Sequence, residues 1–177
     1  VVGAPRKNSF TGVVRAYQYI GGNWTQIGSD INGDANFDNA GNAVSISEDG
    51  TIIAVGIYGG NGKVRIYKNV GGTWTQVGND LNPAAGVEQF GRSVSLSQDG
   101  NMIAIGASAG QNKVLIYQNV NDTWTQVGND INGDAEIDFF GYSVALSDDG
   151  STVAVGVLNK AQARVYKNNN GTWTQLG

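Results

Sequence analysis

Two segments of the chain carry side chains with the oxygen ligands that a hard cation prefers. In each segment, Asp and Asn alternate with small or apolar residues around a glycine. The oxygen-bearing residues are Asp30, Asn32, Asp34 and Asp38 in the first segment and Asp130, Asn132, Asp134 and Asp138 in the second. Calcium takes roughly six to eight such oxygen ligands. The sequence therefore names these residues as candidate calcium ligands and predicts no other cofactor.

A second interpretation of the same segments needs no metal. Asn and Asp in loops often bond their own backbone and form solvated turns. The corresponding segment of the middle repeat keeps Asp80 but then reads Pro83-Ala84-Ala85, so it loses most of the acidic residues. The glycine also comes earlier than in an EF-hand loop. The solvated turn is the favoured interpretation, with calcium as the alternative.

A pair of carboxylates such as Asp134 and Asp138 could in principle perform acid–base chemistry on a glycan. Nothing distinguishes this pair from the similar pair Asp34 and Asp38 in the first segment. Repeated loops rarely hold a unique active site. We therefore expect no catalytic residue and no enzymatic activity.

Composition excludes several other chemistries. The chain has 177 residues, no Cys, no His and a formal net charge of −4. The missing Cys and His exclude disulfides, thiolate catalysis, a Ser-His-Asp triad and the usual zinc sites. The acidic balance argues against nucleic acid as a partner. No apolar run is long enough to span a bilayer, no signal-peptide pattern opens the chain, and the absence of an initial Met suggests a processed or partial chain.

The elements that must position these loops follow from an internal repeat. Trp24, Trp74, Trp124 and Trp173 lie in nearly identical phrases at spacings of 50, 50 and 49 residues. Other columns keep the same register, among them Asp49-Gly50, Asp99-Gly100 and Asp149-Gly150. We divide the chain into a partial blade with the last two strands at 1–23, repeats at 24–73, 74–123 and 124–172, and the first strand of a further blade at 173–177.

Each repeat is expected to form four short strands. In the repeat at 74–123 these are the Trp phrase, the alternating segment 93–97, the apolar run 102–106 and the β-branched segment 113–117. Each Asp-Gly pair predicts a two-residue hairpin in which both residues have positive φ.

Four antiparallel strands at this period are typical of β-propeller blades. A β-sandwich would not need such regular repetition, and a β-helix would need a shorter period. The sequence predicts an all-β chain of about three and a half blades, a segment of a larger propeller whose open ends contact other blades or neighbouring protomers.

Recurring aromatic and basic columns have two interpretations. The tryptophans could stack on sugars. However, one tryptophan recurs at the same position in each repeat, and this regularity favours packing between blades. The same holds for the tyrosine column, and the adjacent arginines are expected to pair with neighbouring carboxylates. These columns are Tyr67, Tyr117 and Tyr166, and Arg15, Arg65 and Arg164.

Three turns before the Trp phrases match the N-glycosylation sequon. Their acceptors are Asn23, Asn121 and Asn170. Asn-rich turns followed by a fixed Thr also produce this pattern by accident, so glycan attachment and an accidental match are equally favoured.

Further phrases resemble a known family. The chain contains Gly3-Ala4-Pro5 once, and Phe90-Gly91 and Phe140-Gly141 in later repeats, with Ala40-Gly41 in the first full repeat. These phrases resemble the FG-GAP repeat, the blade unit of integrin α-subunit propellers. The calcium loop that such blades often carry is replaced here by Ser-x-Asp-Gly turns.

The resemblance implies a non-enzymatic, extracellular or cell-surface module for adhesion or recognition. Its protein or glycan ligand would bind to the loop face. Two alternatives remain: a structural protomer of an extracellular filament or sheath, and a carboxylate-based enzyme that acts on glycans.

Overall fold

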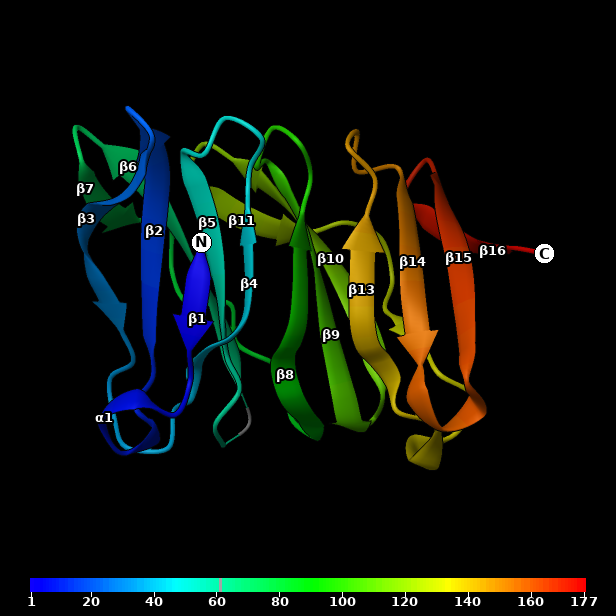
Figure 1. Ribbon diagram of the computed structural model, residues 1–177. Helices are drawn as coiled ribbons and strands as arrows, with labels where there is room; N and C mark the ends of the chain where they lie inside the picture. Colours follow the sequence, from blue (N-terminus) through cyan, green and yellow to red (C-terminus); the bar gives the residue numbers. More distant parts are fainter. Residues whose placement is uncertain (61) are drawn as a thin grey trace.

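A computed structural model describes residues 1–60 and 62–177, and in it the chain folds into four antiparallel β-sheets (Figure 1). The first sheet has three strands, the second and fourth have four, and the third has four with a short additional strand. The strands are β1 (Val2–Ala4), β2 (Val13–Ile20), β3 (Asn23–Asn32), β4 (Ala40–Ile46), β5 (Ile52–Ile57), β6 (Lys63–Val70), β7 (Thr73–Gln76), β8 (Val87–Leu96), β9 (Met102–Gly110), β10 (Lys113–Val120), β11 (Thr123–Gln126), β12 (Ile131–Asn132), β13 (Phe140–Leu146), β14 (Thr152–Val157), β15 (Gln162–Asn169) and β16 (Thr172–Leu176).

Helical structure is limited to single turns. These are α1 (Lys7–Phe10) and the 3₁₀ turns at Glu136–Asp138 and Leu158–Lys160. Among the described residues, no helix has both the length and the apolar character needed to cross a membrane.

The sheets are propeller blades. Within each sheet the strands follow one another in chain order, and the first strands β4, β8 and β13 contact each other from sheet to sheet. Figure 1 shows the blue first sheet towards one end of the arrangement and the orange to red last sheet at the other. The first strands therefore lie nearest to the axis, and the Trp strands β7, β11 and β16 form the outer edges. The predicted all-β propeller fold is confirmed.

The phase of the blades differs from that of the sequence repeat. β7 pairs with β6 through the turn at Gly71 and Gly72, both of which have positive φ. Each Trp strand thus completes the preceding sheet, and β16 completes the fourth sheet instead of opening a further blade. The sequence period defines the length of the unit but not the strand at which a sheet begins.

The predicted two-residue Asp-Gly hairpins are wrong. Gly50 has a φ of 72°, but Asp49 does not have positive φ. The strands close at Ser47, whose backbone N–H donates to the Ile52 carbonyl at 2.9 Å, so four residues form the turn. The Asp49 carboxylate accepts hydrogen bonds from the Ser47 hydroxyl at 2.6 Å and the Thr51 backbone at 2.9 Å. Asp49 therefore closes the turn with its side chain and does not itself need a left-handed backbone conformation.

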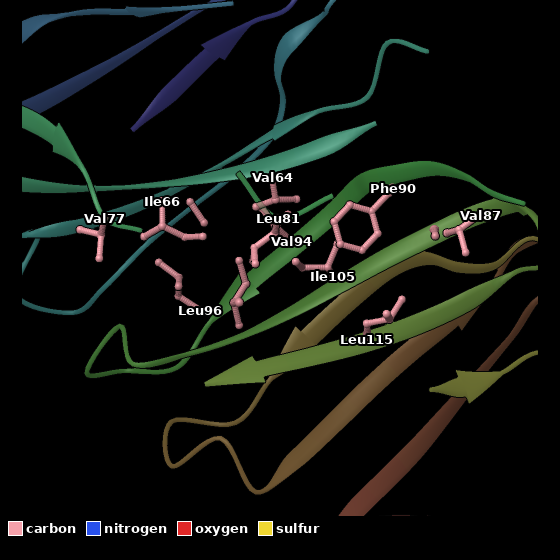
Figure 2. Packing of buried hydrophobic residues seen from close by; sticks show 13 residues of the cluster. Val64, Ile66, Val77, Leu81, Val87, Phe90, Val94, Leu96, Ile105 and Leu115 are labelled. Atoms are coloured by element: carbon pink, nitrogen blue, oxygen red, sulfur yellow. The ribbon is translucent and has the colours of Figure 1, made fainter. Parts of the chain in front are cut away.

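Apolar clusters fill the spaces between neighbouring sheets. Figure 2 shows the cluster between the second and third sheets, where Ile66 of β6 lies near Leu96 of β8 and Phe90 lies near Ile105 of β9. Ile66, Phe90 and Ile105 are each no more than 1% exposed. Equivalent clusters join the first sheet to the second and the third to the fourth. Burial of this apolar surface is the main stabilising contribution to blade stacking.

A backbone contact between blades recurs at three glycine pairs. A Cβ atom on Gly106 of β9 would lie 2.1 Å from the carbonyl oxygen of Gly141, in the next blade. The same approach joins Gly56 to Gly91 at 2.2 Å and Gly3 to Gly41 at 2.0 Å. Only glycine leaves room for the carbonyl of the next blade, so Gly3 of β1, Gly56 of β5 and Gly106 of β9 set the distance between blades.

We expect Gly106→Ala to lower the free energy of unfolding by about 1–3 kcal/mol, because the new methyl group collides with backbone that cannot rotate away. Gly156→Ala is the matched control: its Cβ would meet only the same blade, with the movable Ser143 hydroxyl nearest at 2.3 Å. Urea unfolding of both variants measures the difference. Equal losses would contradict this role for the Gly106 contact.

Candidate functional site

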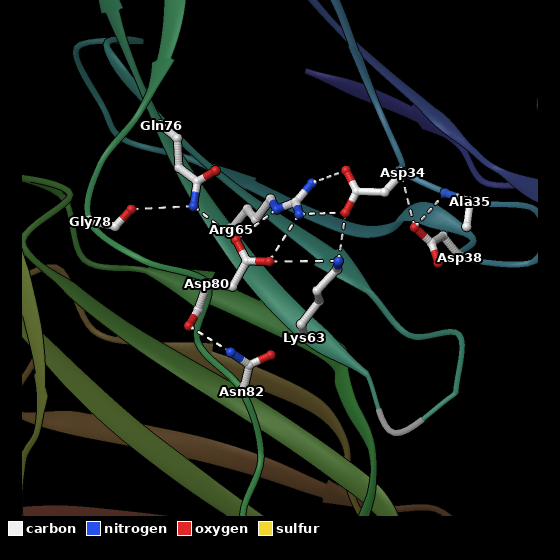
Figure 3. A network of polar contacts seen from close by, with 9 residues as sticks. All are labelled: Asp34, Ala35, Asp38, Lys63, Arg65, Gln76, Gly78, Asp80 and Asn82. Carbon is white, nitrogen blue, oxygen red and sulfur yellow. Dashed lines mark hydrogen bonds and ion pairs between the residues drawn. The ribbon is translucent and has the colours of Figure 1, made fainter.

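The acidic loop residues lie in ion pairs. Arg65 of β6 donates to Asp80 through Nε at 2.8 Å and to Asp34 through Nη1 at 2.8 Å (Figure 3). Lys63 contacts the same two carboxylates, at 2.7 Å for Asp34 and 3.6 Å for Asp80. Asp34 belongs to the loop that leads from the first sheet into the second, so this network joins successive blades. The Arg65 guanidinium holds the pKa of Asp34 well below its usual range.

The same pairing recurs in other blades. Asp134 accepts hydrogen bonds from Arg164 of β15, and Lys160 contacts Asp138 at 2.7 Å. Arg15 of β2 holds Asp30 through two hydrogen bonds of 2.8 Å. The arginine column therefore pairs with neighbouring carboxylates, as its position in the repeat suggests.

The middle repeat exchanges both partners at once. It carries Ala84 where the other loops carry Asp34 and Asp134, and Leu115 where the neighbouring blades carry Arg65 and Arg164. Leu115 is 6% exposed and belongs to the apolar cluster between the second and third sheets. Apolar residues thus occupy both positions of this ion pair, a change that proteins often tolerate.

The predicted calcium ligands are not gathered around one point. Asp38 accepts the backbone N–H groups of Asp34 at 2.8 Å and Ala35 at 3.1 Å, while the Asp34 carboxylate faces basic side chains. Asp130 pairs with Lys113 at 2.7 Å. The side chains of Asn32 and Asn132 donate to the backbone carbonyls of the aspartates two residues before them. Over residues 1–60 and 62–177 there is no cluster of three or more metal-binding acidic side chains. Calcium binding stays a prediction, because in this arrangement these side chains do not surround a common point.

A different polar cluster lies on the axial strands. β4, β8 and β13 each contain an irregularity at the same place, between Ala40 and Ala43, Phe90 and Ser93, and Phe140 and Ser143. A bulge of this kind re-aims the side chain of an unpaired residue. The residues that follow the bulge glycines are Asn42, Arg92 and Tyr142.

Arg92 contacts both of the other residues, each from a neighbouring blade. The Nη2 group of Arg92 donates to the Tyr142 hydroxyl at 2.8 Å, and Nη1 lies 3.5 Å from the Asn42 side-chain oxygen. The Asn42 amide donates to the Arg92 carbonyl at 3.3 Å. The Arg92 guanidinium also lies over two aromatic rings, 4.6 Å from the centre of Tyr142 and 5.5 Å from that of Tyr58. We call Asn42, Tyr58, Arg92 and Tyr142 the axial cluster.

Arg92 differs from the other arginines in the blades. Arg15, Arg65 and Arg164 each form ion pairs with aspartates. Arg92 is partly buried and forms no ion pair with any described residue. A partly buried cation without a carboxylate is costly to maintain for stability alone. The axial cluster is therefore the strongest candidate for a functional site.

The sequence offered a signal for this cluster that our prediction missed. The Gly of each Phe-Gly or Ala-Gly phrase is constant, whereas the next residue is Asn, Arg or Tyr. A glycine inside a strand often marks a bulge. A residue that varies directly after a constant bulge glycine is free to serve function instead of packing.

Three of the four tryptophans pack between blades. The indole N–H of Trp74 donates to the Ile27 carbonyl at 3.0 Å, and that of Trp173 donates to the Val127 carbonyl at 2.9 Å. Trp124 packs against the cluster between the second and third sheets. Trp24 is 70% exposed.

The sequon residues Asn23, Asn121 and Asn170 lie on exposed positions at the turns before the Trp strands. Exposure leaves these turns accessible, and their glycosylation stays a prediction.

Comparisons with known proteins place this geometry in context. No protein-family model matches the chain, and no curated protein matches it. Among solved structures, a protein from Bacteroides uniformis named as a candidate 6-phosphogluconolactonase has a TM-score of 0.69 at 14% identity, over 93% of this chain and 46% of that one. The periplasmic gluconolactonase of Pseudomonas aeruginosa has a TM-score of 0.63 at 19% identity, over 94% of this chain and 48% of that one.

A functionally unknown protein from Desulfotomaculum acetoxidans is similar to the same extent, with a TM-score of 0.65 at 21% identity, over 94% of this chain and 48% of that one. The chain thus spans about half the length of these similar structures. At these identities the likeness shows the propeller fold.

These findings correct two predictions. The assignment to the FG-GAP family is wrong, because no family model matches and the similar structures include gluconolactonase-type propellers. Short phrases such as Gly3-Ala4-Pro5 reflect close packing of blades, which other propellers also need. The prediction of a non-enzymatic adhesion module is corrected on the same finding, since proteins named as enzymes share this fold.

The exchange of both partners in the middle repeat leads to a test. We expect Arg65→Leu alone to lower the free energy of unfolding by about 1–2 kcal/mol, because Asp34 and Asp80 then share only Lys63. The double variant Asp34→Ala, Arg65→Leu should recover part of this loss, since it leaves the single pair of Lys63 with Asp80, which is equivalent to the pair of Lys113 with Asp130 in the next blade. A double-mutant cycle in urea measures the coupling, and strictly additive losses would contradict it.

The carboxylates at the turns predict acid sensitivity. Hydrogen bonds, chiefly from Ser147, lower the pKa of Asp149 from 3.8 to about 2. Arg15 similarly lowers the pKa of Asp30 to about 2. Because these pKa values are depressed by folding, their stabilising contribution is complete above about pH 4 and is lost as the pH falls towards 2.

We therefore expect the free energy of unfolding to decrease between pH 4 and pH 2, and to decrease less in Asp149→Asn than in the unaltered chain. Asp122→Asn is the control, because the exposed Asp122 side chain forms no hydrogen bond with any described residue. Urea unfolding at a series of pH values measures the slopes. A slope in Asp149→Asn as steep as in the unaltered chain would show that Asp149 does not contribute.

Proposed function

We propose that this chain forms part of the axial site of a propeller hydrolase that opens a sugar lactone. The observation that carries the proposal is the position of Arg92, which lies at the axis without a carboxylate partner and contacts Asn42 and Tyr142 from the two neighbouring blades. The structural likeness to proteins named as gluconolactonases supports the choice of reaction.

The chemistry of the axial cluster suits this reaction. Water adds to the lactone carbonyl carbon and gives up a proton to solvent, and negative charge develops on the carbonyl oxygen. The ring C–O bond then breaks, and the ring oxygen takes up a proton from solvent to give a hydroxy acid. A positioned guanidinium stabilises such an oxyanion. The Tyr142 hydroxyl accepts a hydrogen bond from Arg92 and keeps its own proton, which it would donate to an oxygen of the lactone.

The scaffold holds these groups in fixed positions. Arg92 lies on β8 and Tyr142 on β13, and these strands pair with β9 and β14, which contain many buried residues. Ser93 donates its hydroxyl hydrogen to the Gly141 carbonyl of the next blade at 2.8 Å. Leu146 in turn donates its backbone N–H to the Ser95 hydroxyl at 2.9 Å. These bonds between blades support the pre-organisation that electrostatic catalysis requires.

The proposal extends to location. A periplasmic protein is among those that share the fold, which supports an exported protein at the cell surface or outside the cell. Because the chain spans about half the length of these similar structures, further blades of the complete protein would contribute the rest of the site.

The experiment is a pH-stat assay of acid release from glucono-1,5-lactone by the purified complete protein that contains this chain. We expect release above the uncatalysed rate, reduced about tenfold or more in Arg92→Gln because the oxyanion loses its charged donor. The control is Arg6→Gln, which alters an exposed arginine directly before α1 and should retain activity. Circular dichroism confirms folding. No release above background by the folded complete protein would overturn the proposed function.

A further inference from the structure

We infer that the axial cluster is a receptor for a monocarboxylate, so that the hydroxy acid formed by lactone opening binds more tightly than the neutral lactone. The inference rests on the proposed function for the identity of that acid. Its physical basis, the missing partner of Arg92, is independent of any catalysed reaction.

The charge of Arg92 is not compensated within the described chain. Every other arginine of the blade strands has an aspartate within 2.9 Å. The contacts of Arg92 are instead neutral: the Tyr142 hydroxyl, the Asn42 amide oxygen and two aromatic faces. Aromatic faces attract the guanidinium but do not neutralise it. A ligand carboxylate would supply the partner that the other arginines obtain from the protein.

The donors of Arg92 are suited to a planar ligand. A guanidinium has five N–H donors in a fixed fork. One Nη2 hydrogen is directed to Tyr142, and the contact of Nη1 with Asn42 is long at 3.5 Å. The remaining donors match the two oxygens of a carboxylate, which arginine binds in a bidentate manner. The Tyr142 hydroxyl can donate its own hydrogen to the same carboxylate or to a neighbouring hydroxyl of the ligand.

The surrounding charges favour a single negative charge over two. No second cation contacts the axial cluster among the described residues. The turns at the far ends of the same strands carry Glu48 and Asp148, and backbone hydrogen bonds of 3.0 Å join each of them to Gln98. A phosphate dianion would meet one guanidinium and no second positive charge among the described residues. The site therefore suits a monocarboxylate better than a phosphate.

The test is calorimetric titration of sodium gluconate into the chain at pH 7 and low salt. We expect binding that weakens about tenfold or more in Arg92→Gln, because a charge-assisted bidentate contact is lost. Arg92→Lys should be weaker than the unaltered chain, since an ammonium cannot form the fork. Tyr142→Phe tests the hydroxyl with little change in shape. Arg6→Gln should bind normally.

Two further titrations identify the recognised group. Glucitol has the hydroxyls of gluconate without the carboxylate and should not bind, and inorganic phosphate should bind more weakly than gluconate. Binding of glucitol as tight as that of gluconate, tighter binding of phosphate, or gluconate binding unaffected by Arg92→Gln would each overturn the inference. No gluconate binding by the folded chain would also overturn it.

The two proposals fail in different ways. Gluconate binding that depends on Arg92, without acid release from the lactone, supports the carboxylate receptor and overturns only the hydrolase. Acid release that is not inhibited by added gluconate overturns the receptor and leaves the hydrolase standing.

Discussion

The close stacking of neighbouring blades is the constraint on which the rest of this structure depends. A single four-stranded sheet cannot bury both of its faces, so each blade is stable only against the next. The contact combines apolar clusters with a backbone approach in which the carbonyl of one blade lies where a side chain would otherwise be, as at Gly106 and Gly141. The repeated glycines, the buried aliphatic strands and the tryptophan hydrogen bonds all serve this one contact.

Repetition of the packing contact separates structural positions from functional ones. Residues that pack between blades keep their type from repeat to repeat, whereas Asn42, Arg92 and Tyr142 occupy equivalent positions with different chemistry. The bulge that precedes them serves both purposes. Its glycine, such as Gly91 with a φ of 84°, permits the contact between blades, and the irregular register turns the next side chain towards the cluster. A site of three unlike residues can thus arise within nearly identical blades.

The loop charges show the opposite behaviour, because they change in a coordinated way. Asp34 and Asp134 face Arg65 and Arg164 of the next blade, and where Ala84 replaces the acid, Leu115 replaces the base. An isolated charge at either position would remain without a partner at a partly buried contact. Two of the candidate calcium ligands, Asp34 and Asp134, therefore belong to ion pairs that join successive blades.

The sequence by itself determined the all-β propeller, the length of the blade unit and the buried strands, because periodic apolar residues and turn residues act locally. It could not determine where a sheet begins, since a repeat has no intrinsic phase, and it misassigned the Asp-Gly turns because the side chain of Asp49 closes them. Only the tertiary structure decided that the loop acids pair with arginines and that Arg92 does not. Both facts depend on which residues meet across neighbouring blades, and those residues lie 31 to 50 residues apart in the sequence.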